Sequence, residues 1–426
     1  MIEGDSIVAL GEQQDLAKRF PDADSSDFGV AAIIPGLVNT HSHLELTGMR
    51  GFLEAEESNF FAWLKKLTVA RLEKLTPDDL QVSAIWGACE AARAGVTCLG
   101  DASDSALESM RGLTSVGLRG IVYQESFGPD PQLARENFDS LKSKVAALRE
   151  VETSLVSVGV SPHAPYTVSA PQLELISEFA LTAKLPVMMH VAESEAEELF
   201  VREGRGPFAD GFVKRGINRD APFTSSIEYL ARHGILTTRP LLTHCIHVDE
   251  GDIQAIKHSG AGIAHCPKSN AKFGHGRAPF EKFLAAGIPV GFGSDSVASN
   301  NICDLLEEAR FAVLWSRAAN AGSQHLSASD ALIAATSGGA QAMGLADKVG
   351  TLEAGRQADF AVVGLDGVHQ QPAYDPYAAL VFASSGRDVI LTVVGGKEIY
   401  RDGHLTTIDE KRIASRIREI VAKLKG

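Results

Sequence analysis

The chain has 426 residues, of which 45% are hydrophobic and 22% charged, and a formal net charge of −14 at pH 7. A globular protein of this length buries a large core without disulfides, and its acidic balance excludes nucleic acid and anionic membranes as general partners. No run approaches the ~20 apolar residues of a membrane span, and the start lacks a secretory signal, so we expect a cytoplasmic protein.

The two ends of the chain differ in texture from the middle. Residues 1–34 and residues 350–404 contain short alternating strands with glycine turns, a pattern typical of a small sheet. We therefore expect a small β-sandwich built from residues 1–34 and 350–404, a barrel from residues 35–349 and a C-terminal helix within residues 405–426. Apolar residues recur at helical spacing in that helix: Ile413, Ile417, Ile420 and Leu424.

Between the ends, short apolar runs alternate with amphipathic stretches, of which Pro171 to Leu185 and Asp304 to Arg317 are the clearest helices. Apolar strands alternating with helices predict parallel pairing covered by helices. Eight such units predict an α/β fold closed into a (β/α)₈ TIM barrel, not an open doubly wound sheet. The predicted strands are Gly36 to His43, Val96 to Asp101, Leu118 to Glu125, Leu155 to Ser161, Pro186 to Val191, Pro240 to His244, Gly262 to Cys266 and Pro289 to Asp295.

Nearly every predicted strand ends at, or just before, a residue capable of chemistry. In this type of barrel the carboxyl ends of the strands face one shared mouth, where catalysis occurs. The alternative is that these polar residues only cap loops. That alternative fits poorly, because four of the residues are histidines at the ends of consecutive strands. The strand-end residues are His43, Asp101, Glu125, His163, His190, His244, His265 and Asp295.

Four of these positions suit a metal ion. His41 and His43 stand two residues apart in a strand and therefore project together, whereas His190 and Asp295 close two later strands. Each position also has an alternative without function. His41 and His43 could be exposed histidines of a strand, His190 a hydrogen-bonded histidine of the core, and Asp295 an aspartate that caps a loop. Three imidazoles and one carboxylate suit one divalent cation per subunit, with zinc favoured and iron(II) or manganese also compatible. Such an ion lowers the pKa of bound water toward ~7, which makes hydroxide available.

The fourth and sixth strands leave further alternatives open. The fourth strand ends in Ser161, Pro162 and His163, which offer no carboxylate to bridge two metals, so we expect one ion. His163 is then either a substrate contact or a histidine that orients its loop. His244, at the end of the sixth strand, is either a base beside the metal-bound water or a fourth histidine ligand.

Eight phrases in this order resemble the amidohydrolase superfamily, in its branch of cytosine/adenosine-type deaminases and chlorohydrolases. Together they cover nearly the whole chain and are specific for the branch, but much less so for the substrate. The phrases are PGLVNTHSHLE at 35–45, SPHAPYTVS at 161–169, HVAES at 190–194, THC at 243–245, HCPKSNAKF at 265–273, GSDSVASNN at 293–301, ATSGGAQAMGL at 335–345 and GTLEAGRQADF at 350–360.

The resemblance implies a mechanism of hydrolytic deamination. It implies that His41, His43, His190 and Asp295 hold the metal, and that His244 and Asp295 deprotonate its water. Glu193 then protonates a ring nitrogen of the substrate, the metal-bound hydroxide adds to the amidine-like carbon, and ammonia leaves. The alternative for Glu193 is a solvated loop acid.

The resemblance also suggests substrate contacts. Trp63 resembles a residue of the loop that walls the pocket, where it either stacks on a heteroaromatic ring or only packs. We expect His163, Glu125 and Ser296 to contact the substrate as well. Relatives acting on adenosine-type nucleosides carry an acidic ribose contact shortly after this tryptophan, and Glu73 is the nearest candidate.

Two further segments, residues 122–128 and 198–208, are similar to aminodeoxyfutalosine deaminases, whose adenosine carries a benzoate. S-adenosylhomocysteine/methylthioadenosine deaminases are similar too. Arg202 or Arg205 could bind such a carboxylate bidentately. The sequence is equally compatible with both being solvated surface residues.

Three hypotheses therefore compete. The first is a deaminase of an aminated purine nucleoside, a small heterocyclic substrate. The second is a hydrolase of another heterocycle, of guanine, pterin or halogenated triazine type, and the third is a non-catalytic barrel. The joint presence of four ligands with Glu193 and His244 favours an enzyme. By analogy with the family we expect a homodimer.

Overall fold

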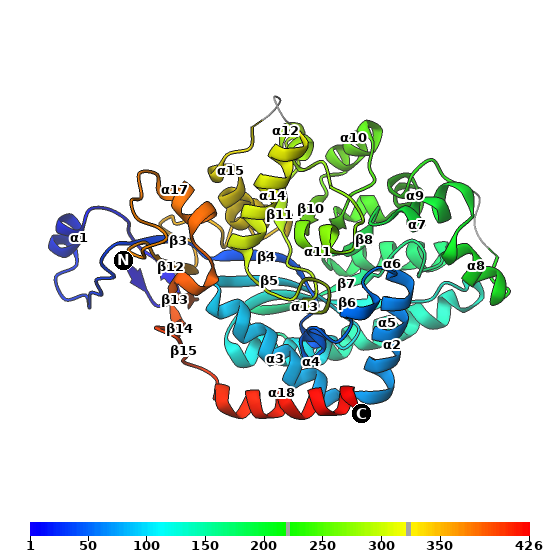
Figure 1. Ribbon diagram of the computed structural model, residues 1–426, viewed down its shortest axis with the longest axis horizontal. Helices are drawn as coiled ribbons and strands as arrows, with labels where there is room; N and C mark the ends of the chain where they lie inside the picture. The colour runs from blue at the N-terminus through cyan, green and yellow to red at the C-terminus, as the bar shows by residue number, and fades with distance from the viewer. Residues whose placement is uncertain (219–221, 321–324) are drawn as a thin grey trace.

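The computed structural model describes residues 1–218, 222–320 and 325–426. Two parallel sheets of four strands form its centre (Figure 1). Parallel bridges from Val160 to Val187 and from Ser42 to Asp295 join the two sheets at both edges, so the eight strands close into a barrel and the predicted fold is confirmed. The strands are β4 (Leu37–Ser42), β5 (Val96–Ser103), β6 (Arg119–Ser126), β7 (Val156–Pro162), β8 (Met188–Val191), β9 (Leu241–His244), β10 (Gly262–His265) and β11 (Val290–Phe292).

Helices surround the strands because each carries one apolar face that must be buried. The helix α3 (Pro77–Arg93) shows how the sequence sets a boundary: Thr76 and Asp79 form a capping box, and a proline opens the first turn. The two helices expected most clearly are present as α6 (Ala170–Ala183) and α14 (Leu305–Ala319). Further covering helices are α4 (Ala106–Val116), α5 (Ala134–Arg149), α10 (Glu250–Ser259), α12 (Phe280–Ala286) and α15 (Ala328–Ile333).

Two inserted segments extend beyond the strand ends. The helix α2 (Phe60–Lys74) follows β4, and α8 (Pro207–Lys214) follows β8 after the short α7 (Glu195–Glu198) and a π-helical turn, η4 (Leu199–Glu203). The rings of Phe61 in α2 and Phe208 in α8 lie 5.7 Å apart. The two inserts therefore meet, although about 140 residues of chain separate them, and both lie toward the right in Figure 1.

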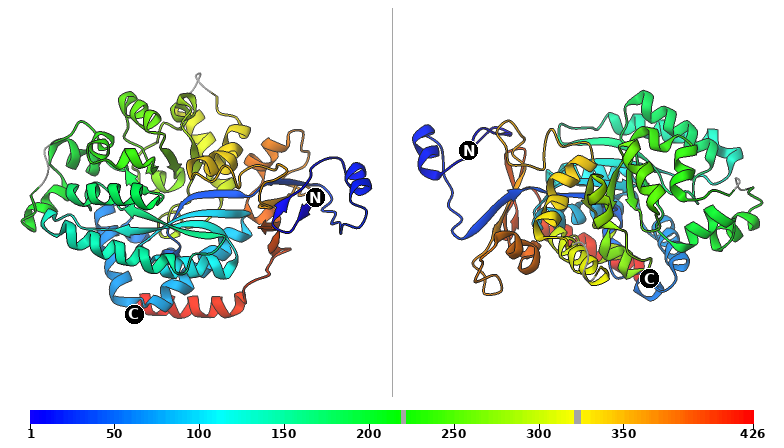
Figure 2. Two further views of the ribbon diagram at one scale, coloured as in Figure 1. Left: turned by 180° about the vertical axis from the view of Figure 1, so that it is seen from behind. Right: turned by 90° about the horizontal axis from the view of Figure 1, so that it is seen from above.

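Both chain ends contribute to a smaller antiparallel sheet beside the barrel (Figure 2). Its strand order is β15–β14–β13–β12–β3, and a two-stranded ribbon, β1–β2, joins it through a bridge from Ser6 to Gln357. Arg119 at the start of β6 forms a buried ion pair with Asp359, at 2.7 Å, which fixes this sheet to the barrel. The boundaries of the domains remain a prediction. The strands are β1 (Ile2–Glu3), β2 (Ser6–Ile7), β3 (Ala31–Pro35), β12 (Phe360–Gly364), β13 (Val389–Val394), β14 (Lys397–Arg401) and β15 (His404–Leu405).

The expected C-terminal helix is present as α18 (Glu410–Lys425) and runs along the lower edge of the barrel in Figure 1. Asp409 caps its first turn, and the ammonium group of Lys423 pairs with Asp79 of α3 at 2.6 Å. Ile420 is completely buried in the cluster that also contains Trp63 of α2. The helix therefore supports the base of the insert that reaches the barrel mouth. Within the described ranges, no helix combines the length and apolarity needed to cross a membrane.

Candidate active site

Three histidines and an aspartate converge at the carboxyl ends of β4, β8 and β11. The Nε2 atoms of His43 and His190 are 3.3 Å apart. The Oδ1 atom of Asp295 lies 3.4 Å from Nε2 of His41 and 3.7 Å from Nε2 of His43. His41, His43 and Asp295 form one group whose ligand atoms lie within 4.8 Å of one another, and His41, His190 and His244 form another. A metal ion could therefore be held here, and the assignment of the four predicted ligands stays a prediction.

The protonation of these imidazoles suits a metal. Nδ1 of His190 lies 3.0 Å from the carbonyl oxygen of His163 and donates to it, which leaves the lone pair of Nε2 free for a cation. Nε2 of His41 is buried and makes no well-formed hydrogen bond to any residue that the structure describes. Burial lowers the pKa of His41 and His190, and that of His43 to about 3. Neutral imidazoles with aligned lone pairs fit a divalent cation.

Asp295 is held in place by two hydroxyl groups. Its Oδ2 atom accepts hydrogen bonds from Ser269 at 2.6 Å and from Ser299 at 3.2 Å. Burial opposes ionisation, but the contact with His41 outweighs it and holds the pKa of Asp295 well below its usual range. The aspartate is therefore an anion whose Oδ1 faces the histidines, as a metal ligand requires.

The backbone is strained where these strands end. Ala192, His244, Cys245 and Asp295 all have a φ between 47° and 75°, a region that residues other than glycine rarely adopt. Such conformations cost about 1–3 kcal/mol each and persist where the surrounding structure imposes them, frequently at functional sites. Three strand ends are thus bent to aim their side chains at one point.

Glu193 and His244 form a pair beside the four ligands. Oε1 of Glu193 lies 3.6 Å from Nε2 of His244, and both side chains are buried. Nδ1 of His244 donates to Oδ1 of Asn270 at 2.9 Å, so Nε2 carries the lone pair and can accept a proton. Burial raises the pKa of Glu193, which favours its protonated form. The arrangement therefore places a proton acceptor next to a proton donor.

The backbone around Glu193 is fixed by a second buried acid. Glu197 accepts hydrogen bonds from the backbone N–H groups of Ala192 and Glu193, at 2.7 and 3.1 Å. Burial raises the pKa of Glu197 to about 8. Glu197 is completely buried, and the sequence analysis did not single it out. Its spacing four residues after Glu193 was the only available signal.

A cavity of about 750 Å³ opens over the site, and its lining includes all four predicted substrate contacts. Trp63 packs between Phe60 and Phe273, with ring centroids 6.2 and 5.0 Å away. The lining also contains His43, His190, Glu193, His244 and Asp295. Three of the four predicted ligands therefore share one cavity with the predicted acid, base and substrate contacts, whereas His41 is completely buried beneath it.

His163, Glu125 and Ser296 differ in how they line this cavity. Nδ1 of His163 lies 2.9 Å from the hydroxyl of Thr167, which fixes the orientation of the ring. Ser296 caps a short helix with its hydroxyl, which accepts from the N–H of Ala298. Glu125 provides a carboxylate oxygen within 4.8 Å of nitrogens of His43 and His190. Glu125 thus approaches the ligands more closely than its position in the sequence indicates.

Glu125 belongs to a group of buried carboxyl groups with Glu45 and Asp101. Burial raises the pKa of Glu125 to about 8 and that of Asp101 to about 7, and it raises the pKa of Glu45 well above the usual value. Asp101 accepts from the hydroxyl of Ser42 and the N–H of Leu44. These contacts fix the end of β4 and the segment that follows it, which carry His41 and His43.

Three other candidates from the sequence lie elsewhere. Glu73, the candidate ribose contact, is exposed at the end of α2 and does not line the cavity. Arg202 and Arg205 pair with Glu198 and Glu203, and neither lines the cavity. The expectation that these arginines meet a substrate carboxylate is therefore not supported by their position.

His275 was missed by the sequence reasoning. Its ring lies 4.7 Å from Phe60 and 5.3 Å from Phe273, and its Nε2 lies 3.9 Å from Oε1 of Glu193. His275 follows no strand directly, and only tertiary packing brings it to the acid, so no local pattern indicates it.

A closed parallel barrel with ionisable residues gathered at the carboxyl ends of its strands is typical of an enzyme. In a comparison with known protein families, residues 32–399 match the Amidohydrolase family. Among curated proteins, the chain is 34% identical to the 5-methylthioadenosine/S-adenosylhomocysteine deaminase of Natronomonas pharaonis, over 100% of this chain and 94% of the relative. It is 30% identical to the enzyme of the same name from Pelotomaculum thermopropionicum, over 99% and 93%.

Solved structures agree with this relationship. An adenosine deaminase from Xanthomonas campestris with bound zinc superimposes with a TM-score of 0.88 at 27% identity, covering 100% of this chain and 93% of that one. The atrazine chlorohydrolase TrzN from Arthrobacter aurescens, at 24% identity and a TM-score of 0.84 over 99% and 94%, shares the fold. The chain belongs to the amidohydrolase family and is a hydrolase that acts on carbon–nitrogen bonds.

Proposed function

We propose that this protein is a metal-dependent hydrolytic deaminase of an adenosine-type nucleoside. One observation carries the proposal: Glu193 and His244 lie 3.6 Å apart in the cavity that His43, His190 and Asp295 also line. Deamination of a cyclic amidine needs a proton acceptor for the attacking water and a proton donor for the ring, and these two residues can fill both roles. The names of the relatives support the same chemistry.

His41, His43, His190 and Asp295 would hold the ion, for which zinc is our first choice. When bound, a divalent cation acts as a Lewis acid and lowers the pKa of water toward ~7. The residues of the chain have distinct tasks. Asn270 holds His244 with its Nε2 toward the cavity, so that this atom can take a proton from water.

Glu193 is placed to supply the proton that activates the ring of the substrate. Because burial raises its pKa, its protonated form is favoured relative to that of an exposed glutamate, and this form can pass a proton to a ring nitrogen of the purine. Protonation makes the neighbouring carbon a better electrophile for water, whose proton passes to His244. Transfer of that proton to the amino group lets ammonia leave as the C–N bond breaks, and the added hydroxyl returns a proton to Glu193 as the carbonyl forms. The cavity of about 750 Å³ lies in the usual range for small-molecule sites and has room for a whole nucleoside.

The substrate is tested by ammonia release. The purified protein is stripped with a chelator, reloaded separately with zinc, manganese or iron(II), and incubated with adenosine, 5′-methylthioadenosine, S-adenosylhomocysteine and aminodeoxyfutalosine. We expect ammonia from at least one adenine nucleoside, only after reloading. Release only from guanine, a pterin or a triazine would overturn the proposal, as would full activity of the stripped protein.

A further inference from the structure

His275 belongs to a segment that also positions two other groups of the site. The helix α11 (Pro267–Lys272) follows β10, and its Ser269 donates to the carboxylate of Asp295 at 2.6 Å. Its Asn270 accepts a hydrogen bond from the imidazole of the predicted base. The chain then turns, and the backbone N–H of His275 donates to the carbonyl oxygen of Asn270 at 3.0 Å. His275 is thus tied to the residue that orients the base, while its own side chain faces the acid.

Aromatic packing fixes the imidazole of His275. Its ring lies 5.3 Å from that of Phe273, at an angle of 28° between the planes, and Phe60 of α2 meets it edge-on at 4.7 Å. Only 10% of the side chain is exposed, and Nε2 lies 3.9 Å from Oε1 of Glu193. The two phenylalanines therefore confine the ring with Nε2 toward the acid.

The nitrogen that faces Glu193 is buried without a hydrogen bond. Nε2 of His275 has no such partner within the part of the chain that the structure describes. A buried polar atom without a partner destabilises a fold, so its presence at a site calls for a functional reason. Burial lowers the pKa of His275 to about 4, so the imidazole is neutral at pH 7. The other ionisable groups that act on it are His244, His247 and Asp295.

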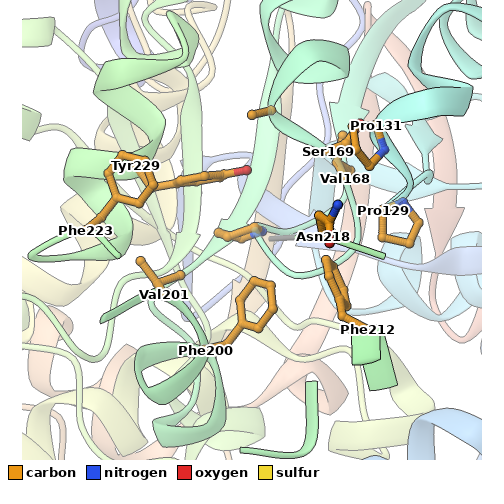
Figure 3. A pocket seen from close by; sticks show the side chains of 12 residues that line it. Pro129, Pro131, Val168, Ser169, Phe200, Val201, Phe212, Asn218, Phe223 and Tyr229 are labelled. Carbon is orange, nitrogen blue, oxygen red and sulfur yellow. The ribbon is translucent and has the colours of Figure 1, made fainter. Parts of the chain in front are cut away.

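His275 approaches the acid from outside the cavity. Glu193 lines the cavity of about 750 Å³, whereas His275 does not. A second hollow, whose lining includes Phe212 and Tyr229, measures about 30 Å³ and has room for about one water molecule (Figure 3). As the described residues form it, this hollow does not reach His275 either. A substrate in the cavity and His275 therefore contact Glu193 from different sides.

The proposed reaction requires a hydrogen-bond donor behind the acid. Glu193 becomes a carboxylate when it protonates the ring, and a buried carboxylate is costly without a donor. Nε2 of His244 also lies near Oε1, at 3.6 Å. However, Nδ1 of His244 donates to Asn270, so Nε2 of the neutral ring has no hydrogen to give. A neutral imidazole with its hydrogen on Nε2 at position 275 meets the need.

We infer that His275 is a positioning residue for Glu193: its Nε2–H group holds Oε1 of the acid and stabilises the carboxylate that remains when the proton has moved to the substrate. The inference rests on the proposed function and adds to it a residue outside the cavity. The hydrogen of His275 stays on Nε2 throughout, and Oε2 of Glu193 carries the proton that is transferred. The gap of 3.9 Å is longer than a hydrogen bond of about 2.9 Å, and contacts of this kind often shorten when the substrate binds.

Three variants separate the hydrogen bond from the packing. His275→Phe keeps an aromatic ring against Phe60 and Phe273 but removes the donor, whereas His275→Gln restores an amide N–H. His258→Phe is the matched control, because His258 is an exposed histidine of α10. Each zinc-loaded protein is assayed for ammonia release from the adenine nucleoside that the wild type uses best. Zinc content and melting temperature are measured alongside.

His275→Phe should lower kcat about 10–100-fold, the range for one hydrogen bond to a charged group, with KM, zinc content and melting temperature nearly unchanged. A donor to a carboxylate lowers its pKa, so loss of the donor should move the alkaline limb of the kcat profile to higher pH. His275→Gln should recover part of kcat and move the limb back. His258→Phe should behave as the wild type does.

The same substitution in a Glu193→Gln background tests whether the two residues act together. There His275→Phe should lower kcat by less than about twofold further, because the partner that it serves is already absent. An equal fold-loss in both backgrounds, a normal kcat in His275→Phe, or an alkaline limb that does not move would overturn the inference and leave deamination intact.

A measurement without turnover separates this inference from the proposed function. In zinc-loaded protein with isotope-labelled histidine, the imidazole nitrogen signals absent from both His275→Phe and His275→Gln belong to His275. Nε2 should carry the hydrogen, and its signal should shift in Glu193→Gln but not in Glu195→Gln, whose acid is exposed. If these signals behave so while no nucleoside releases ammonia, the deaminase proposal fails and the positioning role stands. A bare Nε2, or a signal insensitive to Glu193→Gln, overturns the role.

Discussion

Replacement of Glu193 by glutamine tests the role of the acid most directly. Glutamine keeps the volume of the buried side chain but cannot transfer a proton to the substrate. A positioned general acid contributes typically 10²–10⁴-fold, so we expect kcat to fall about 10³-fold, or about 4 kcal/mol in the barrier. Burial raises the pKa of Glu193 and so favours the neutral form, which the amide resembles, and we expect the substitution to leave the fold stable.

The measurement is kcat and KM for ammonia release, together with elemental analysis of the metal and the melting temperature. Metal content should not change, because the four predicted ligands remain. Glu195→Gln is the matched control, since Glu195 is an exposed acid two residues away, and it should retain near-normal activity. A loss of less than tenfold in Glu193→Gln, or an equal loss in the control, would refute the reasoning.

Three further predictions concern the groups around the acid. Asp295→Asn should abolish turnover and lower zinc occupancy by elemental analysis, and a metal-replete, active variant would contradict its role as a ligand. Asn270→Ala should lower kcat by about 10–100-fold with little change in KM, because Nδ1 of His244 loses the hydrogen-bond acceptor that orients the ring. An unchanged kcat would show that other contacts orient the base. Burial raises the pKa of Glu125 to about 8 from an ordinary 4.5, so its protonated form stabilises the fold at low pH, and this contribution is lost as pH rises toward about 8. In chelator-treated protein, the melting temperature of the wild type should therefore fall relative to Glu125→Gln between about pH 5 and pH 9, and parallel curves would refute this assignment.

Much of the barrel and of its strand-end chemistry could be predicted from the sequence, for a physical reason. Strands buried on both faces are continuous apolar runs, and a barrel brings their carboxyl ends to one mouth. His41 and His43 are an i, i+2 pair, and His190 and His244 end their strands or lie within them. These positions are fixed by local periodicity and by the closure of the barrel, which a single sequence reveals.

The walls of the cavity could not be predicted in the same way. Arg202 was a candidate for the substrate anion, whereas Lys214, twelve residues later, lines the cavity. Between them the chain passes through a π-helical turn and two glycines with φ of 65° and 90°, Gly204 and Gly206. A π-helical turn and glycines with positive φ cannot be foreseen from helical periodicity, so the sequence does not indicate which of these cations lines the cavity.

The two parts of the site that differ in predictability also differ in their expected tasks. The strand ends carry the groups expected to act on the heterocycle, whereas the inserts line the part of the cavity expected to select the substrate. The groups that act on the heterocycle are attached to strands whose hydrogen bonds are part of the closed barrel, and Asp295 is even tied to β4 through a backbone hydrogen bond of 2.9 Å to the carbonyl of His41. The outer lining of the cavity, in contrast, includes Lys65 of α2 and Lys214 of α8. These two inserts meet through Phe61 and Phe208 and share no strand. Changes to the inserts can therefore alter the remote part of the substrate without moving the acid, the base or the predicted ligands, and their effects should appear in KM and in the choice of substituent, not in kcat.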